Sequence, residues 1–185
     1  QLQQFSKDIK AQKQLFILIT AFSFSINSHS QDVGYRTFDA GGEYQYAKDG
    51  PAFNLQLAFN AEEYHAIVLR AGYMKAMGKT TSAHTNESGS GWGGSIGYRY
   101  HFSVIPKRFF IGARAGLWNL NINWSVPEAE GVTKLLVLQP AIETGFTWVI
   151  NDCFFITPQL SASVQTTLNT KGEKVAYGTG FIPMA

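Results

Sequence analysis

The sequence predicts an all-β protein whose eight antiparallel strands follow one another up and down along the chain. Two observations lead to this prediction: apolar residues occupy every second position in successive stretches, and groups of turn residues separate the stretches. A period of two indicates strands, because neighbouring side chains of a strand point to opposite faces of its sheet. Glycine is frequent, with 18 in 185 residues, and the length suits a single domain.

The alternation is clearest at residues 154–168. One face carries Phe154, Ile156, Pro158, Leu160, Ala162, Val164, Thr166 and Leu168. The other face, after Phe155, is small, polar and uncharged, with Thr157, Gln159, Ser161, Ser163, Gln165 and Thr167. At about 15 residues this strand is longer than the roughly 5–6 usual in soluble proteins, which favours a strand that crosses a membrane.

In chain order, the eight expected strands span residues 33–46, 52–60, 64–77, 92–102, 108–124, 135–150, 154–168 and 177–185. In the first strand, Asp39 and Glu43 lie opposite Tyr44 and Tyr46, and the turn residues 48–51 end it. The next two strands share an apolar face made of Phe53, Leu55, Leu57, Phe59, Ile67, Leu69, Ala71 and Tyr73. The fourth strand has an apolar face of Trp92, Ile96, Tyr98, Tyr100 and Phe102.

The fifth strand changes phase along its length. Ile111, Ala113, Ala115 and Leu117 form its first apolar face, but beyond Leu117 the apolar residues are Leu120, Ile122 and Trp124. If these last three face outward, Asn119, Asn121 and Asn123 face inward. A one-residue change of phase is what a β-bulge produces, so the sequence predicts a bulge at Leu117 or Trp118.

The sixth strand points Leu136, Leu138, Pro140, Ile142, Phe146 and Trp148 outward. Two polar stretches without periodicity, residues 78–91 and 125–134, are expected to be long loops. The links at 104–107 and 151–153 are short. Long loops at one end and short turns at the other are typical of bacterial outer-membrane barrels.

The polar face decides between a membrane barrel and a soluble one. A soluble lipocalin-like barrel binding a hydrophobic ligand is the competing fold, with its apolar face inside. Here the polar face carries one charge on each of five strands, whereas a water-exposed face would carry several per strand. These five charges are expected to pair inside a narrow lumen: Glu43, Arg70, Arg99, Arg114 and Glu143.

Tyrosine and tryptophan fall near the strand ends of the apolar face, as in the aromatic belts at membrane interfaces. The expected interfacial aromatics are Tyr44, Tyr46, Tyr73, Trp92, Tyr98, Tyr100, Trp124 and Trp148. Together with the charged inner face, they favour an eight-stranded up-and-down transmembrane β-barrel.

Residues 1–30 have the layout of a cleavable signal peptide. Lys7, Lys10 and Lys13 precede an apolar run at residues 15–26, which is too short to span a bilayer as a helix. Removing residues 1–30 leaves 12 basic and 12 acidic residues, so no basic surface for nucleic acid remains. The domain prediction is therefore a leader at 1–30 and a barrel at 31–185.

The mature chain resembles the small outer-membrane β-barrel proteins of Gram-negative bacteria, the eight-stranded group that includes OmpX and the membrane domain of OmpA. The glycine and aromatic strands at residues 91–102 and 109–118 carry the resemblance, with the leader that ends before Gln31. A Gln at that point is most similar to proteins of the Bacteroidota. The resemblance implies a monomer in the bacterial outer membrane, surrounded by lipid and inserted by the barrel-assembly machinery. Such barrels usually end on an aromatic residue, whereas here Pro183, Met184 and Ala185 come last, so a truncated eighth strand is expected.

No residues predict catalysis, a cofactor or a metal site. His101 and Ser103 are spaced as in lipid A deacylase barrels, but His101 is expected on the inner face and at the periplasmic end, away from the lipid those enzymes cut. His84 lies in a polar loop, no two histidines have metal-ligand spacing, and Cys153 is the only cysteine.

The function expected from the sequence is a non-enzymatic one, structural or interactive, with residues 78–91 and 125–134 as contact surfaces for an unknown extracellular partner. A narrow porin-like channel is the alternative, and the two differ in whether arginine and glutamate side chains close the lumen.

Overall fold

The computed structural model describes residues 23–25, 38–47, 50–61, 64–79, 85–103, 107–126, 129–150, 154–173, 175, 177 and 180–184. These residues form β1 (Ser23–Ser25), β2 (Phe38–Ala47), β3 (Gly50–Asn60), β4 (His65–Lys79), β5 (Thr85–His101), β6 (Lys107–Val126), β7 (Ala129–Val149), β8 (Phe155–Ile156), β9 (Gln159–Lys171) and β10 (Gly180–Met184). No helix in this described part is long and apolar enough to cross a lipid bilayer.

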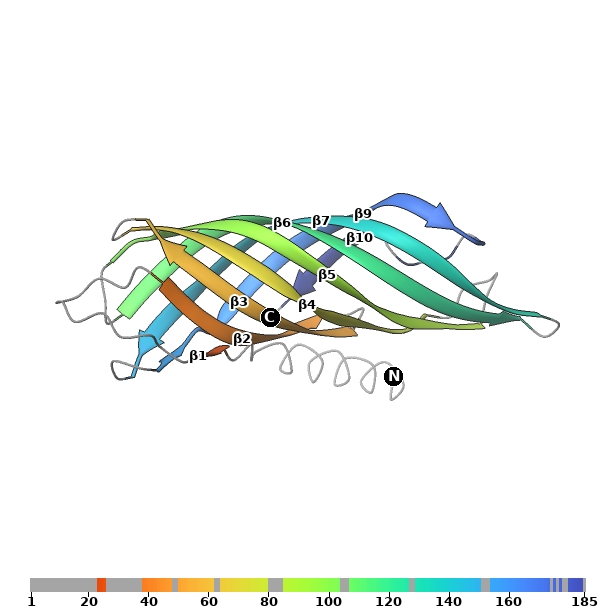
Figure 1. The fold of residues 1–185 in the computed structure, drawn as a ribbon, viewed down its shortest axis with the longest axis horizontal. Helices are drawn as coiled ribbons and strands as arrows, with labels where there is room; N and C mark the ends of the chain where they lie inside the picture. Colours follow the sequence, from red (N-terminus) through yellow and green to blue (C-terminus); the bar gives the residue numbers. More distant parts are fainter. Residues whose placement is uncertain are drawn as a thin grey trace, which may run out of the picture.

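The strands form an antiparallel, up-and-down ring, which confirms the all-β prediction (Figure 1). Neighbours along the chain pair from β2 through β7, and β7 pairs with both β8 and β9. Thr157 and Pro158 interrupt what is otherwise one strand from β8 to β9, because proline has no N–H to give to the ladder. The ring is completed where β10, paired with β9 over five residues, meets β2 at Met184 and Ala47.

The expected leader is only partly described. Residues 1–22 and 26–37, which include the start of the first expected strand, lie outside the described residues, so the signal peptide stays a prediction. Within this region, β1 pairs antiparallel with residues 41–43 of β2.

The two faces of the ring follow the alternation in the sequence. On the outer face, large apolar side chains such as Leu55 and Trp92 are exposed, by 73% and 70%. On the inner face, the polar side chains of Gln56, Arg70 and Gln159 are buried. This is the reverse of a lipocalin-like arrangement, in which the apolar face is inside.

The bulge expected at Leu117 or Trp118 is wrong. The pairing of β6 with β7 is continuous from Lys107 to Val126. Trp118, Leu120 and Ile122 continue the inward face to which Arg108, Phe110 and Arg114 belong. Asn119, Asn121 and Asn123 are exposed. The strand therefore keeps its phase while the inner face changes from polar to apolar.

The inward apolar residues of this end form one cluster, which we call the apolar cluster. Its members are Ala52, Met74, Ala76, Trp118, Leu120, Ile122, Leu135, Val137 and Tyr177. Burial of these apolar side chains against one another stabilises this end of the ring, whereas the interior around Arg114 is polar.

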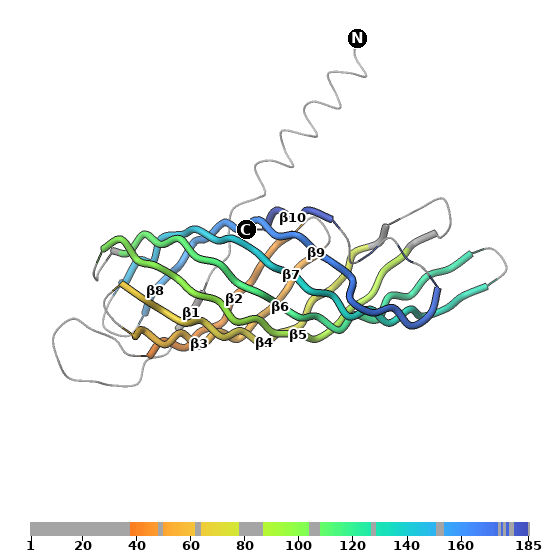
Figure 2. The backbone as a smooth tube through the Cα atoms, turned by 90° about the horizontal axis from the view of Figure 1, so that it is seen from above, coloured from red at the N-terminus to blue at the C-terminus, as the bar shows by residue number. Residues whose placement is uncertain are grey.

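The two expected long loops are also wrong in extent. β4 continues to Lys79 and β5 begins at Thr85, while Val126 and Ala129 still pair across the β6 to β7 connection. The hairpin of β6 and β7 reaches furthest from the ring (Figures 1 and 2). Small residues such as Ser88 and Gly89 show no alternation of apolar and polar side chains, but pairing with the neighbouring strand β6 keeps them extended.

Real register shifts occur elsewhere. They lie between Ala76 and Lys79 in the pairing of β4 with β5, near Thr85 to Ser88 on β5, and opposite Leu136 and Val137, where β9 holds one extra residue. All three lie toward the same end of the ring as the apolar cluster.

The orientation of β6 is testable by a matched pair of substitutions. Leu120→Ala removes a fully buried side chain and is expected to lower the free energy of unfolding by about 2–5 kcal/mol. Asn121→Ala, next to it on the outer face, is expected to change it by less than about 0.5 kcal/mol. Urea unfolding followed by tryptophan fluorescence measures both. If Asn121→Ala were the more damaging change, the inward face of β6 would be misassigned.

Candidate functional site

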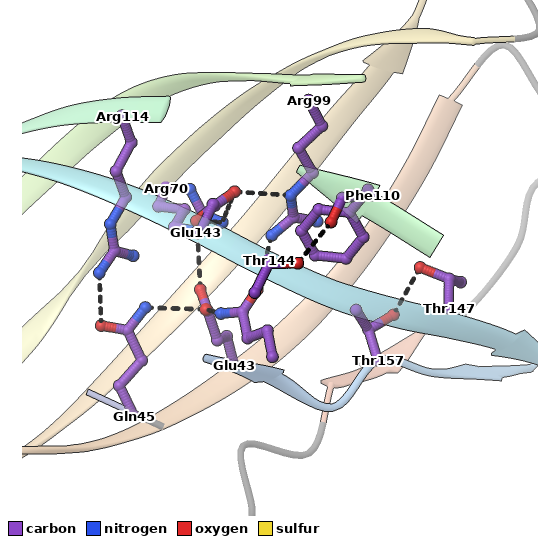
Figure 3. Close-up of polar contacts among 11 residues, drawn as sticks. Glu43, Gln45, Arg70, Arg99, Phe110, Arg114, Glu143, Thr144, Thr147 and Thr157 are labelled. Carbon is purple, nitrogen blue, oxygen red and sulfur yellow. Dashed lines mark hydrogen bonds and ion pairs between the residues drawn. The ribbon is translucent and has the colours of Figure 1, made fainter. Parts of the chain in front are cut away.

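The candidate site is a network of buried charges inside the ring. Alternation points Glu43 from β2, Arg70 from β4, Arg99 from β5, Arg114 from β6 and Glu143 from β7 to the same interior. Each residue is at most 8% exposed. The structure thus brings together all five charges that the sequence singled out, as Figure 3 shows.

Hydrogen bonds join four of these charged side chains and Gln159 in a closed cycle. Arg70 Nε donates to Glu43 Oε2 at 2.8 Å, and Arg70 Nη2 reaches Glu143 Oε2 at 3.0 Å. Arg99 Nε donates to Glu143 Oε1 at 2.7 Å, and Arg99 Nη2 donates to Gln159 Oε1 at 2.8 Å. Gln159 Nε2 donates to Glu43 Oε1 and completes the cycle. Five strands that are not all neighbours are thereby linked through their side chains.

Gly112 makes room for part of this cycle. It is paired with Arg99 on one side and Glu143 on the other. A Cβ added at Gly112 would lie 2.6 Å from the Tyr98 carbonyl oxygen, 3.1 Å from Arg99 Cγ and 3.2 Å from Glu143 Cγ. The absence of a side chain lets the arginine and the glutamate meet across the backbone between them.

Arg114 differs from the other two arginines. Its Nη2 lies 3.3 Å from Gln45 Oε1 and 3.7 Å from Met184 Sδ, both neutral acceptors. Gln45 in turn donates through Nε2 to Glu43 Oε1 at 2.8 Å. Arg114 therefore reaches a carboxylate only through an amide, and the network holds three arginines for two glutamates.

The network fills the middle of the ring, and other groups fill each end. On one side lies the apolar cluster, to which Tyr177 belongs, its hydroxyl donating to the Met77 carbonyl oxygen at 2.5 Å. On the other side the Arg99 guanidinium lies 4.4 Å from the centre of the Phe110 ring, a cation–π contact. Thr157 and Thr147 are hydrogen-bonded to each other further along (Figure 3).

Seven of the eight expected interfacial aromatics lie on the outer face, six of them in two belts. Tyr44, Tyr73 and Trp92 share one row, in which Tyr44 is paired with Phe53, Phe53 with Tyr73 and Tyr73 with Trp92. Tyr46 is one row further out. At the opposite end of the strands, Tyr98, Tyr100 and Trp148 are exposed along with Phe102 and Phe109.

The expectation that Trp124 lies among the interfacial aromatics is wrong. It has the inward parity of β6, donates from Nε1 to Thr133 Oγ1 at 3.1 Å, and packs over Gly131, where a Cβ would meet its ring at 2.3 Å. It belongs to the tip of the β6 and β7 hairpin rather than to an interfacial belt. Its position follows from the uninterrupted phase of β6.

The sequence interpretation missed the glutamines and the apolar cluster. Gln45 and Gln159 are as much part of the network as the charges, since each bonds Glu43. The alternation in the sequence predicts that both glutamines face inward. A neutral residue on a polar face, however, is not distinguished from its polar neighbours. Arg108 is also buried on the inner face.

Among the described residues, His101 and Ser103 do not form a reactive site. His101 is buried on the inner face with its ring 5.7 Å from that of Phe110, whereas Ser103 is exposed beyond the end of β5. Within the described part of the chain, no three His, Cys, Asp or Glu side chains are grouped to hold a metal ion. His84 and Cys153 lie outside the described residues.

The fold and the network together define a class: an all-β ring of antiparallel strands with an ion-paired interior and an apolar outer face. No protein-family model, no curated protein and no solved structure matches this chain.

The network predicts a strong dependence of stability on Glu143. Glu143→Gln leaves Arg70 and Arg99 buried with one carboxylate fewer, and is expected to cost roughly 3–5 kcal/mol of unfolding free energy. Glu130→Gln, on an exposed part of β7, is the control and is expected to cost less than about 0.5 kcal/mol. Equal urea midpoints for the two variants would contradict the role assigned to the network.

Proposed function

We propose that this chain is an integral outer-membrane β-barrel of non-enzymatic function, which presents its extended hairpins at the cell surface. The observation that supports this is the outer face, where Leu55, Leu69, Ile96 and Ile142 are exposed by 39–73%. A soluble protein seldom leaves such a large apolar surface in contact with water, whereas lipid is a favourable surrounding for it.

The height of this apolar surface suits a bilayer. On the outer face of β4, the residues between His65 and Lys75 are Ile67, Leu69, Ala71 and Tyr73. Ten residues at about 3.3 Å each, tilted by about 40°, rise roughly 25 Å, the height of the apolar band in known outer-membrane barrels. The two aromatic belts bound this band, as expected of residues at the membrane interfaces.

The interior favours a structural role over transport. An eight-stranded barrel is just wide enough for its own side chains, and here they are bonded across the ring. A solute would have to break the cycle and displace the apolar cluster. The barrel is therefore a rigid support, and the function at the cell surface belongs to the extended hairpins.

The part most suited to contact a partner is the hairpin of β6 and β7. Above the apolar band, its outer face carries the amides of Asn119, Asn121 and Asn123, all exposed. Amides displayed on a paired strand are held in fixed positions at little entropic cost, which favours recognition of a polar partner.

Membrane insertion is tested by heat-modifiability. Residues 31–185 refolded in detergent are expected to run faster on an SDS gel when unboiled than when boiled, because a closed barrel resists SDS. Insertion into vesicles is expected to protect the band region from protease. A fragment that is soluble without detergent and shows no shift would contradict the proposal and favour a soluble barrel.

A narrow channel is the second candidate, favoured by the excess of one arginine in the interior, which would prefer anions. Planar bilayer recording separates the two functions. The closed barrel is expected to give no conductance steps up to 100 mV. Steps that prefer anions, and that lose this preference in Arg114→Gln, would establish a channel instead.

A further inference from the structure

A groove of about 610 Å³ crosses the outer face of β2, β3, β4 and β5. Its walls include Tyr44, Phe53, Tyr73 and Trp92, and the part nearer the buried network is lined by Leu55 and Ala71. The four aromatic residues are the row already described, with ring centres 4.8 Å apart for Tyr44 and Phe53 and 5.0 Å apart for Tyr73 and Trp92. The groove is therefore apolar and is edged by two pairs of aromatic rings in contact.

The floor of the groove is open at Gly42. A Cβ built at this residue has no atom within 4 Å, whereas most glycines of the ring have close neighbours. The row below the aromatic residues pairs Gly42 with Leu55 and Leu55 with Ala71. A glycine and an alanine in this row leave a hollow where larger side chains would give a flush surface.

A basic row lies directly above the aromatic row. Four successive cross-strand pairs connect Lys75 to Ser90, Ser90 to Asn121, Asn121 to Lys134 and Lys134 to Lys171. The three lysines are exposed, and no carboxylate lies on this row among the described residues. Lys134 and Lys171 face each other on β7 and β9, outside the strands that form the groove, whereas Lys75 is on β4, one of its walls.

We propose that the groove binds one acyl chain of a membrane lipid whose phosphate headgroup is held by Lys75. The inference rests on the proposed membrane location and adds a specific lipid site to it. Lys75 is paired with Ser90 one row beyond Tyr73 and Trp92, so a chain that lies in the groove against these rings brings its headgroup to the ammonium. The apolar chain fits the groove, and the anionic headgroup lies next to the lysine.

The charge and the hollow make different contributions to this site. The hollow accepts a chain of any lipid, because burial of methylene groups does not depend on the headgroup. Lys75 selects among lipids, and one lysine near a membrane surface contributes about 1 kcal/mol of attraction to an anionic headgroup, which corresponds to a preference of about fivefold.

Trp92 provides the readout, because it forms one wall of the groove and is 70% exposed. The full mature chain is reconstituted in phosphatidylcholine vesicles at physiological salt with a small fraction of brominated lipid, whose bromine quenches tryptophan fluorescence on contact. The part of the quenching that is lost in Trp92→Phe belongs to this site. Brominated phosphatidylglycerol is expected to occupy it about fivefold better than brominated phosphatidylcholine.

Two matched pairs of variants separate the two parts of the site. Lys75→Gln is expected to abolish the preference for phosphatidylglycerol, while Lys134→Gln, on the same row but three strands away, retains it. Gly42→Leu fills the hollow and is expected to lower Trp92 quenching by both lipids. Ala113→Leu, which adds three carbons rather than four to the outer face of β6, is the control and leaves the quenching unchanged.

Equal quenching by the two brominated lipids in the unmodified protein would overturn the proposal, as would a preference that survives Lys75→Gln. Each variant is first checked for the heat shift on a gel. A protein that shows the shift but no lipid preference contradicts the lipid site alone, whereas the absence of the shift contradicts the membrane barrel itself.

Discussion

The hydrogen-bonded cycle of Glu43, Arg70, Glu143, Arg99 and Gln159 is the interaction on which the rest of the structure depends. Charges removed from water are costly unless each finds a partner of good geometry, and here each carboxylate accepts from more than one donor. These contacts fix which residues of β2, β4, β5, β7 and β9 face inward. A one-residue slip would turn a charge, or in β9 the amide of Gln159, to the outer face.

The apolar cluster explains how the same ring keeps its shape beyond the network. From Trp118 onward β6 buries apolar side chains inside and displays asparagines outside, the opposite of its chemistry around Arg114. The exchange of faces occurs level with the aromatic row that contains Trp92, which is paired with Asn119. Above this level the hairpins bury their apolar side inward, as strands surrounded by water do.

The strands, their order and the five network charges were predictable from alternation alone, because period and charge placement are local properties of the sequence. The phase of β6 was not. Leu120 and Ile122 look like the outer face of a membrane strand, and only their packing with other buried residues, such as Leu135 and Val137 of the neighbouring strand β7, shows that they face inward. The extended hairpins were missed for a related reason: Ser88 and Gly89 carry little pattern, and it is pairing with β6 that keeps them in a strand.

The cycle also has a kinetic consequence. Glu43 and Gln159 are 116 residues apart in the chain, and Arg70 and Glu143 are 73 apart. A ring that lacks β7 and β9 therefore holds three arginines with Glu43 as the one carboxylate of the network, and Arg99 lacks both of its partners. Contacts between such distant residues form late, after the entropy of closing long loops has been overcome. Partly assembled rings therefore gain little from their interior charges, and the last strands to arrive convert an unfavourable interior into a bonded one, which makes assembly of this ring an all-or-none event.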